Sequence, residues 1–378
     1  MVLWSNGPIT LIDFKIIATD GNARRGVLDT PHGRAETPVF MPVGTNATIK
    51  MVTPDRLAQT GATIILSNAY HLALRPGEEV VRHFGGLHGF MSWPGPILTD
   101  SGGFQVLSLA KLRRVDDDGV EFQSHVDGST IFLTPERSIE IQNALGADII
   151  MCFDECVSYP VEHYAAQKAV ERTLAWAGRC REAHGKADQA LFGIVQGSVF
   201  ADLRAQCADR LVEMDFPGYA LGGCSVGEGQ DLMNEVIEVS APHLPEAKPR
   251  YLMGVGTPED ILEAVERGID MFDCVMPTRN ARGACAFSSR GKVRLRNVQY
   301  RMSDDPIDDT CDCYACRNFS RGYLRHLFNV KEGVAAILTS IHNIHFYQKL
   351  MEGIRSAITR QEFCGFKRGF LGHYEGDS

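Results

Sequence analysis

The sequence predicts an α/β fold, namely a (β/α)8 TIM barrel with a small cysteine-rich subdomain inserted near its C-terminal end. Eight short apolar runs follow one another in the first part of the chain, and each run ends in a polar residue or a glycine. Helix-like segments follow most of these runs, as expected for parallel strands joined by helices. No glycine-rich phosphate-binding turn follows the first run, so the barrel is favoured over a doubly wound sheet.

The eight apolar runs are expected to form the strands of the barrel. They lack strict alternation of apolar and polar residues, as do parallel strands that are buried on both faces. The runs are Thr37–Gly44, Ala62–Asn68, Gly95–Asp100, Asp148–Asp154, Leu191–Gln196, Tyr219–Gly223, Arg250–Gly256 and Ile269–Cys274. Amphipathic helices are expected between them, for example at Ala165–Ala183, Ala201–Met214 and Pro258–Arg267.

Three expected helices share a start signal in which threonine is followed by proline and an acidic residue. The threonine can cap the first backbone amides, and proline has a backbone geometry that suits the first helical position. The acid complements the positive end of the helix dipole. The signal occurs at Thr53–Asp55, Thr134–Glu136 and Thr257–Glu259.

The composition is that of a globular protein. The 378 residues are 44% hydrophobic and 22% charged, and the length suits one large barrel or two ordinary domains. No apolar run approaches the ~18 residues of a membrane helix, and the first residues lack the pattern of a signal peptide. Eleven cysteines are an odd number, and without export a disulfide framework is not expected. We therefore expect a cytoplasmic protein without a membrane partner.

Three cysteines form a C-x-C-x2-C cluster at Cys311, Cys313 and Cys316. Three thiolates and one imidazole are the ligand set of a closed, four-coordinate zinc site, which is structural because no coordination position stays open. Three histidines follow the cluster, and spacing alone does not choose among them. These candidates are His326, His342 and His345.

Positive charge is concentrated just before the cysteine cluster, although the net charge is −9. Residues 279–301 include no Asp or Glu. The seven basic residues of this stretch are Arg279, Arg282, Arg290, Lys292, Arg294, Arg296 and Arg301. Such a run is either a solvated basic face or a phosphate-binding surface, and its place beside the metal cluster favours phosphate contact.

Three segments are expected along the chain. Residues 1–281 would form the barrel, and residues 282–341 would form the zinc-binding subdomain with its polyanion-contacting surface. Residues 342–378 would complete both the barrel and the zinc site, with a closing helix at Asn343–Thr359.

Carboxylates stand at the ends of three apolar runs. Asp100, Asp154 and Asp273 would lie at the C-terminal ends of barrel strands, the usual active-site face of this fold. The structural alternatives are a helix cap or turn for Asp100 and an ion-pair partner for Asp154. Asp270 alternates with Asp273, so only one of these two is expected in the site.

Amide groups are expected beside these acids, because Gln196 and Gly223 end two further runs. Such groups can read the edge of a planar heterocycle. Several neighbouring carboxylates suit nucleophilic or general acid–base chemistry at an electrophilic sugar carbon. Three aspartates are also a ligand set for Mg²⁺, and the residues alone leave that alternative open.

Seven motifs, spread over nearly the whole chain, resemble those of the bacterial-type tRNA-guanine transglycosylases, the queuine or preQ1 tRNA-ribosyltransferases. The motifs stand in the family's order, and jointly they are highly specific. They are Glu36–Thr45, Leu98–Gln105, Phe153–Cys156, Gly193–Ser198, Arg250–Gly256, Asp270–Arg282, and Cys311–Cys316 with Ile341–Asn343.

The resemblance implies an enzyme that exchanges guanine-34 in tRNAs with a GUN anticodon, which are those for aspartate, asparagine, histidine and tyrosine. The incoming base would be a free 7-deazaguanine. The reaction would be ping-pong through a covalent enzyme–RNA species, in a homodimer and without ATP or a redox cofactor. A non-catalytic, zinc-containing tRNA-binding subunit of the same family is disfavoured by the presence of both Asp100 and Asp273. An archaeal-type relative would be expected to carry further C-terminal RNA-binding domains.

The resemblance also implies roles for individual residues. Asp273 would be the nucleophile on ribose C1′ and Asp100 the general acid/base. The base pocket would comprise Ser101, Phe104, Asp154, Gln196, Gly223, Cys224 and Met253, with the phenylalanine and the methionine on the two faces of the base. RNA would be bound by Arg279 and Arg282. Zinc would be held by Cys311, Cys313, Cys316 and His342.

The chain departs from the bacterial pattern at two places. Family members commonly have Leu-Ala where this chain has Cys224 and Ser225, beside the expected position of the 7-substituent of the base. Val226 argues for the small aminomethyl base preQ1, because users of queuine usually have glycine there, whereas Cys224 and Ser225 leave queuine open. After Arg282 the usual Asn-Gly is replaced by Gly283–Cys285, so the fine RNA contacts at that point are not carried over.

Overall fold

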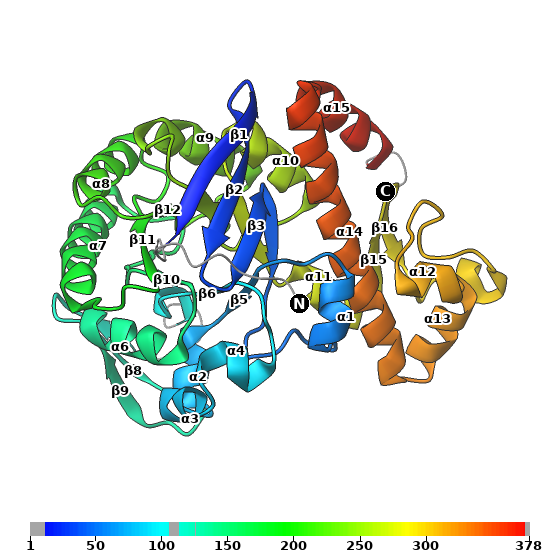
Figure 1. The fold of residues 1–378 in the computed structure, drawn as a ribbon, viewed down its shortest axis with the longest axis horizontal. Coiled ribbons are helices and arrows are strands. Elements are labelled where there is room, and N and C mark those ends of the chain that lie inside the picture. The colour runs from blue at the N-terminus through cyan, green and yellow to red at the C-terminus, as the bar shows by residue number, and fades with distance from the viewer. Residues whose placement is uncertain (1–11, 106–112, 125, 375–378) are drawn as a thin grey trace, which may run out of the picture.

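The computed structural model describes residues 12–105, 113–124 and 126–374. At its centre are eight parallel strands in the order β4-β14-β13-β12-β11-β10-β6-β5. The two ends of this sheet meet at a parallel bridge between Val43 and Leu66, where the Gly44 amide donates to the Leu66 carbonyl at 2.6 Å. The sheet is therefore closed, and the predicted (β/α)8 barrel is confirmed (Figure 1).

A barrel strand lies at each of the eight expected apolar runs. The strands are β4 Val39–Pro42, β5 Ile65–Ser67, β6 Ile97–Thr99, β10 Ile149–Met151, β11 Ala190–Val195, β12 Tyr219–Leu221, β13 Arg250–Leu252 and β14 Met271–Cys274. Every residue in them is buried except Asp273, which is half-buried. Burial on both faces explains why the runs do not alternate.

Helices surround the barrel (Figure 1). The three helices expected from amphipathic patterns are present as α7 His163–Ala183, α8 Ala201–Glu213 and α10 Pro258–Glu266. The other helices between the barrel strands are α1 Pro54–Gln59, α2 Ala69–Leu74, α3 Glu78–His83, α4 Gly86–Met91, α6 Pro135–Leu145 and α9 Gln230–Ser240, which continues into the 3-10 turn η1 Ala241–His243. Helix α11 Met276–Arg282 follows the last strand.

The three threonine–proline start signals all precede a helix, but only two of the threonine side chains act as caps. The Thr134 hydroxyl accepts from the Arg137 amide at the start of α6. Thr257 and Asp260 form a reciprocal capping box at the start of α10. Thr53 has the extended backbone of a cap residue at the start of α1 without a side-chain cap hydrogen bond. At α1 the start signal therefore consists of Pro54 and the acidic Asp55, without a capping hydrogen bond from the threonine side chain.

An N-terminal antiparallel sheet, which the sequence pattern did not predict, covers one end of the barrel (Figure 1). Its strands are β1 Asp13–Asp20, β2 Ala23–Thr30 and β3 Gly33–Thr37. Leu28 and Ala35 from this sheet belong to the same buried cluster as the side chains inside the barrel. The guanidinium of Arg24 pairs with the fully buried Asp270 below strand β14. The sheet thus closes the end of the barrel where the strands begin.

A second antiparallel sheet is inserted between β6 and α6, and it too was not predicted. It consists of β7 Arg113–Val115, β8 Val120–Gln123 and β9 Thr130–Leu133. Val120 and Phe122 are buried while Glu121 and Gln123 are exposed, so β8 has one face against the core. This sheet packs on the same side of the barrel as α6.

The metal-binding subdomain lies beside the barrel, with α14 between the two (Figure 1). It contains β15 Cys285–Ser288, β16 Gly291–Arg294, the 3-10 turn η2 Val298–Met302, α12 Tyr314–Asn318 and α13 Arg321–Asn329. Most of its buried apolar side chains form a cluster separate from those of the barrel, whereas Phe287 of β15 belongs to the barrel core. The long helix α14 Gly333–Arg360 begins ten residues before the expected closing helix, so the expected division after residue 341 falls inside one helix. Helix α15 Phe363–Tyr374 then packs against α14.

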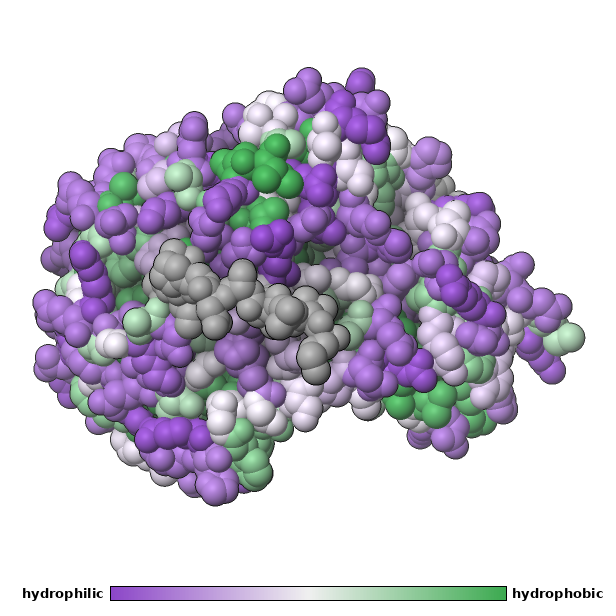
Figure 2. All heavy atoms as spheres, in the orientation of Figure 1, coloured by the Kyte–Doolittle hydropathy of each residue, from purple (hydrophilic) through white to green (hydrophobic). Residues whose placement is uncertain are grey.

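The face that carries the N-terminal sheet is largely hydrophilic, with hydrophobic side chains gathered in small areas (Figure 2). Among the described residues, no helix combines the length and the apolar character needed to cross a lipid bilayer.

Candidate active site and metal centre

The strand-end residues singled out in the sequence lie together at one end of the barrel. Asp100 follows β6, Asp154 follows β10, Gln196 follows β11, Gly223 follows β12 and Asp273 lies within β14. Parallel strands of a closed barrel all end on the same face, so these five residues share one mouth. The N-terminal sheet covers the opposite end, which leaves this mouth as the open face of the barrel.

Asp100 is a buried carboxylate held by three donors. Its oxygens accept from Asn68 Nδ2 at 2.5 Å, from the Ala69 amide at 2.8 Å and from Gln105 Nε2 at 2.8 Å. Burial nevertheless raises the pKa of Asp100 to about 6, and the negative charge of Asp273 adds to the rise. A carboxyl group with a pKa near neutrality can both release and take up a proton, as a general acid/base must.

Asp273 faces the same space from the other side of the mouth. Its Oδ1 accepts from the Tyr251 hydroxyl at 2.5 Å and from the Gly254 amide at 2.7 Å, while no hydrogen bond from a described residue reaches Oδ2. Burial raises the pKa of Asp273, whereas these two hydrogen bonds lower it and offset part of the rise. The carboxylate is thus oriented through one oxygen, which leaves the other for a reacting atom.

Asp154 connects the acids to the amide groups. Its Oδ1 accepts from Ser101 Oγ at 3.1 Å and its Oδ2 accepts from Gln196 Nε2 at 2.7 Å. Burial raises the pKa of Asp154 to about 6. Within the described part of the chain, the buried Gln196 Oε1 has no hydrogen-bond partner. A buried acceptor without a partner is costly, so this oxygen is suited to an N–H group of a ligand.

Two glycines bring the backbone close to Gln196. A Cβ at Gly222 would lie 2.7 Å from Gln196 Nε2, and a Cβ at Gly223 would lie 2.5 Å from Gln196 Oε1. Gly223 also has a φ of +65°, which side chains disfavour. Among the described residues, none accepts a hydrogen bond from the amides of Gly223 and Cys224. The mouth therefore presents carboxylate and amide acceptors beside free backbone donors, which is complementary to the edge of a planar base.

The remaining predicted pocket residues differ in exposure. Phe104 exposes 49% of its surface, and Met253 is half-buried against the apolar interior of the barrel. Both therefore have surface available to a ligand. Cys224 is buried, with its sulfur 3.8 Å from the Gly222 carbonyl, and burial raises the pKa of its thiol. Cys224 is therefore a neutral, apolar part of the pocket wall rather than a nucleophile.

The cysteine cluster forms a compact metal site with one histidine. The ligand atoms of Cys311, Cys313, Cys316 and His342 lie within 4.8 Å of one another. His342 Nδ1 lies 3.6, 3.5 and 3.3 Å from the three sulfurs in chain order, and His342 Nε2 lies 2.6 Å from the Phe287 carbonyl. Because that carbonyl can only accept, Nε2 carries the proton and Nδ1 directs its lone pair at the sulfurs.

The structure therefore selects His342 from the three candidate histidines. His345 instead lies 2.8 Å from an Asp312 carboxylate oxygen. Hydrogen bonds from the neighbouring cysteines lower the pKa of the Cys313 thiol, which favours the thiolate that binds metals. Four buried or half-buried protein ligands surround the site, so the donor set suits a metal that organises the fold.

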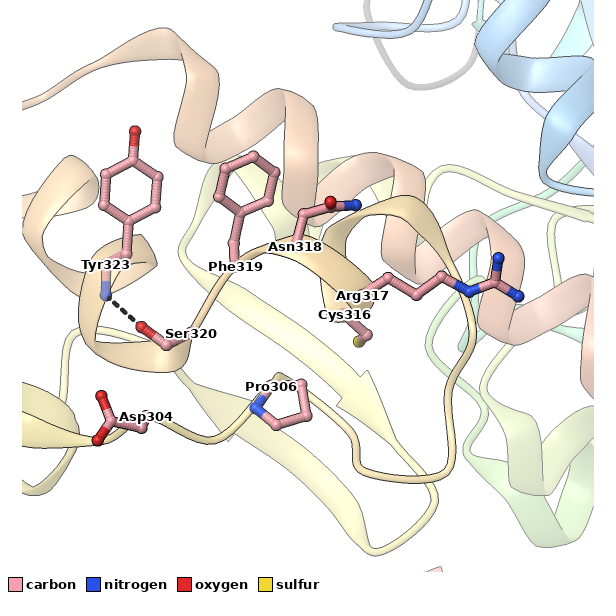
Figure 3. Close-up of a pocket in the computed structure, with 8 residues that line it drawn as sticks. All are labelled: Asp304, Pro306, Cys316, Arg317, Asn318, Phe319, Ser320 and Tyr323. Atoms are coloured by element: carbon pink, nitrogen blue, oxygen red, sulfur yellow. Dashed lines mark hydrogen bonds between the residues drawn. The ribbon is translucent and has the colours of Figure 1, made fainter.

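A pocket of about 560 Å³ is lined in part by Cys316, one of the four residues of the metal site (Figure 3). It is lined by the loop between α12 and α13, where the Ser320 hydroxyl accepts from the Tyr323 amide and the rings of Phe319 and Tyr323 stack 5.5 Å apart. None of the strand-end acids lines this pocket. We therefore place the chemistry at the barrel mouth and not here.

A second group of potential ligands lies at the start of the barrel strands, where His32 and His88 both contact Asp148. The two imidazole rings stack 3.5 Å apart with only 14° between their planes. A histidine binds a metal ion through a nitrogen lone pair that lies in the plane of its ring. One ion cannot lie in both ring planes at once when the rings are stacked and nearly parallel. The group is therefore a hydrogen-bonded cluster that attaches the turn between β2 and β3 to α4 and β10.

Arg279 and Arg282 lie on the short helix α11, directly after the strand that carries Asp273. Arg279 is exposed, and neither arginine pairs with a carboxylate among the described residues. Arg282 donates to the Thr278 carbonyl at 3.0 Å. On the following hairpin, Lys292 and Arg294 are exposed while Val293 between them is buried, so the basic side chains of β16 face solvent.

Three residues that hold the site were missed in the sequence. Tyr251 and Asn68 bind the two catalytic candidates, and neither was singled out, although each lies within a run expected to form a strand. Arg204 lies fully buried beneath the base-edge groups. Its position among Leu203, Cys207 and Leu211 on the buried face of α8 is the signal that could have identified it.

Comparison with known proteins was consistent over the whole chain. A family model described as Queuine tRNA-ribosyltransferase matches residues 20–376. The protein of that name from Caldanaerobacter subterraneus subsp. tengcongensis is 58% identical over 369 residues, which cover 97% of this chain and 98% of the relative. Its counterpart from Thermoanaerobacter sp. (strain X514) is 55% identical over 366 residues, with coverage of 96% and 98%. Its counterpart from Listeria welshimeri is 52% identical over 369 residues, with coverage of 97% for both chains.

Proposed function

This chain belongs to the queuine tRNA-ribosyltransferase family of tRNA-guanine transglycosylases, and we propose that it exchanges guanine-34 of GUN-anticodon tRNAs for a free 7-deazaguanine. The observation that carries the proposal is the pair of carboxylates at the barrel mouth. Asp273 keeps one oxygen available, and the pKa of Asp100 is raised to about 6. A non-catalytic subunit would not need two acids held in this way.

In the first half of the proposed reaction, a carboxylate oxygen of Asp273 attacks ribose C1′ of nucleotide 34. The bond from C1′ to the guanine nitrogen breaks as the C1′–O bond forms, and Asp100 donates a proton to the leaving base. In the second half, Asp100 takes a proton from the corresponding nitrogen of the incoming base. That nitrogen attacks C1′ and releases Asp273.

Two displacements on one carbon retain its configuration, and the departure of guanine before the new base enters gives ping-pong kinetics. One N-glycosidic bond replaces another, so the exchange needs neither ATP nor a redox cofactor. The transition states carry positive charge on the sugar, which the two carboxylates at the mouth stabilise.

We propose that the base pocket forms hydrogen bonds with the edge of the base and also covers its two faces. Asp154 and Gln196 Oε1 would accept from its N–H groups, and the Gly223 amide would donate to its carbonyl oxygen. Phe104 and Met253 would cover its two faces. Ser101 would hold Asp154 in place.

The incoming base is proposed to be preQ1, with queuine as the alternative. Val226 is half-buried, and the Glu228 carboxylate accepts from its amide at 2.8 Å, so this part of the pocket wall is held in place. A branched side chain at that position leaves less room for the larger substituent of queuine. Cys224 is smaller than the usual leucine and therefore leaves more room for the larger substituent of queuine.

Arg279 and Arg282 are proposed to bind phosphates of the anticodon loop. The target base must leave its stack to reach the mouth, which is less costly in a single-stranded loop than in a duplex. The metal is proposed to be zinc, one per chain, because three thiolates and one imidazole are its usual structural ligands. A homodimer is part of the proposal, and exposed apolar residues of the subdomain such as Val298, Met302 and Val330 are available for such contacts.

The proposed function can be tested with GUN-anticodon tRNA and labelled guanine, preQ1 or queuine in parallel. Incorporation of guanine and of one 7-deazaguanine is expected, together with a covalent enzyme–tRNA species that survives denaturation. Asp273→Asn should lower the exchange by at least roughly 10⁴-fold and remove the covalent species. An Asp273→Asn enzyme that still traps RNA would refute the assignment of the nucleophile.

A further inference from the structure

Arg204 lies on α8 with no exposed surface. Its Nε donates to the Ser198 carbonyl at 2.7 Å, and its Nη1 donates to the carbonyls of Val195 at 2.9 Å and Gly222 at 2.8 Å. Its Nη2 lies 3.5 Å from the Gly223 carbonyl. One guanidinium therefore binds carbonyls from the ends of both β11 and β12, the two strands that supply Gln196 and Gly223.

Arg204 has no carboxylate within 4.0 Å in the part of the chain that the structure describes. Burying a cation is costly unless it is paired or fully hydrogen-bonded. The buried Arg24, at the opposite end of the barrel, pairs with the carboxylate of Asp270. Arg204 is instead satisfied by peptide oxygens alone, which indicates that the position of those peptides depends on it.

The bound carbonyls determine where the neighbouring amides point. In a planar trans peptide the C=O and the N–H point in opposite directions. When the Gly222 and Gly223 carbonyls turn toward Arg204, the amides of Gly223 and Cys224 turn away from it. These are the two amides that no described residue accepts from.

We propose that Arg204 is a positioning residue for base recognition, which holds the Gly222–Cys224 peptides so that their amides face the base. This inference rests on the proposed function, because it concerns the same pocket. Glycine at 222 and 223 makes the segment flexible by itself, so an external clamp is needed. Arginine suits this role because its planar fork offers five N–H donors, whereas lysine offers a single rotating ammonium group.

The test compares Arg204→Lys with the matched control Arg250→Lys. Arg250 is also buried and also donates to a backbone carbonyl, that of Leu244 at 2.7 Å, but it lies where the barrel strands begin. The measurements are the KM for the free base, the KM for tRNA, the yield of the covalent enzyme–tRNA species and the melting temperature. Both variants are expected to melt at lower temperature than the parent chain.

Only Arg204→Lys should raise the KM for the free base, by roughly 10- to 100-fold, because one or two aligned hydrogen bonds to the base are weakened. Guanine-34 occupies the same pocket, so the KM for tRNA should also rise, but by less than the KM for the free base, because the phosphate contacts are untouched. The covalent yield at saturating tRNA should stay within about twofold of the parent value, since Asp273 is untouched.

An unchanged KM for the base in Arg204→Lys would overturn the proposal, as would an equal rise in Arg250→Lys. If Arg204→Lys and Arg204→Gln both fail to fold while Arg250→Lys folds, Arg204 is a residue of the fold alone and the proposal is also overturned. Failure of the proposed function is a different result, because the parent chain would then exchange no base at all.

Discussion

At the scale of single residues, two neighbouring aspartates differ in role because their surroundings differ. Asp270 directly precedes β14 and Asp273 lies within it, yet Asp270 is paired with Arg24 at the closed end and Asp273 faces the open mouth. Asp100 is also buried, and its pKa rises from 3.8 to about 6. This rise means that the site disfavours the ionised form relative to the protonated form by about 3 kcal/mol. The candidate active site thus holds carboxylates whose pKa lies near 6.

This leads to a prediction for pH dependence. Burial raises the pKa of Asp100 and Asp154 to about 6 each, so below pH 6 both become protonated. Protonated Asp154 can no longer accept from the base with both oxygens, and kcat/KM for the free base should fall by about 10- to 100-fold per pH unit. Steady-state rates between about pH 5 and 8 measure the profile.

Asp154→Asn removes one titrating group. In this variant, the logarithm of kcat/KM should fall less steeply below pH 6, with a slope smaller by about one unit per pH unit. Asp202→Asn, at an exposed acid of α8, is the control and should keep the parent slope. A parent profile that stays flat across this range would contradict the assignment of these two acids.

At the scale of secondary structure, α14 connects the metal centre to the barrel. It carries His342, and the next residue, Asn343, accepts from the Phe287 amide at 3.0 Å and donates to the Pro277 carbonyl at 2.9 Å. Pro277 lies in α11, the helix that carries the arginines. A metal bound at His342 would therefore stabilise the hairpin and the helix that form the proposed RNA surface.

Loss of the metal should accordingly reduce RNA binding more than base binding. Cys313→Ser should lose the zinc, of which the parent chain should hold about one equivalent, and should bind tRNA at least roughly tenfold more weakly. Metal analysis, circular dichroism and tRNA titration measure these effects. Cys364→Ser, at an exposed cysteine of α15, should retain metal and tRNA binding. A metal-free Cys313→Ser with parent tRNA affinity would show that the subdomain does not depend on its metal.

At the scale of the whole molecule, a net charge of −9 coexists with a local excess of positive charge. The exposed basic side chains Arg279, Lys292 and Arg294 belong to α11 and β16, which follow Asp273 and precede the cysteine cluster along the chain. An acidic body with one basic surface orients a polyanion toward that surface, because like charges elsewhere repel it.

This arrangement predicts the salt dependence of tRNA binding. The logarithm of the affinity should fall linearly with the logarithm of salt concentration between about 50 and 200 mM. Arg279→Gln should reduce the slope by about 0.7–0.9, the value of one phosphate contact. Arg34→Gln, which removes an exposed arginine from β3 at the closed end, should leave the slope unchanged. A parent affinity that does not respond to salt would exclude this surface as the phosphate contact.

The barrel was predictable because its strands are buried on both faces and therefore differ clearly in composition from the helices. The two antiparallel sheets were not predicted, since their strands mix polar and apolar residues and gain their stability from packing on the barrel. Helix boundaries marked by proline were predicted well. The start of α14 was not, because the helix continues without a break from the subdomain into the barrel.

By itself, the sequence determined the barrel, the strand-end acids and the three cysteines, since each depends on local composition and spacing. Spacing left three histidines open and the resemblance implied His342, but only the tertiary structure showed that the His342 imidazole meets the sulfurs. It alone showed Tyr251 on Asp273 and Arg204 on the backbone of the base pocket. Those contacts join residues from different strands and helices, and no spacing along one chain encodes the distance between them.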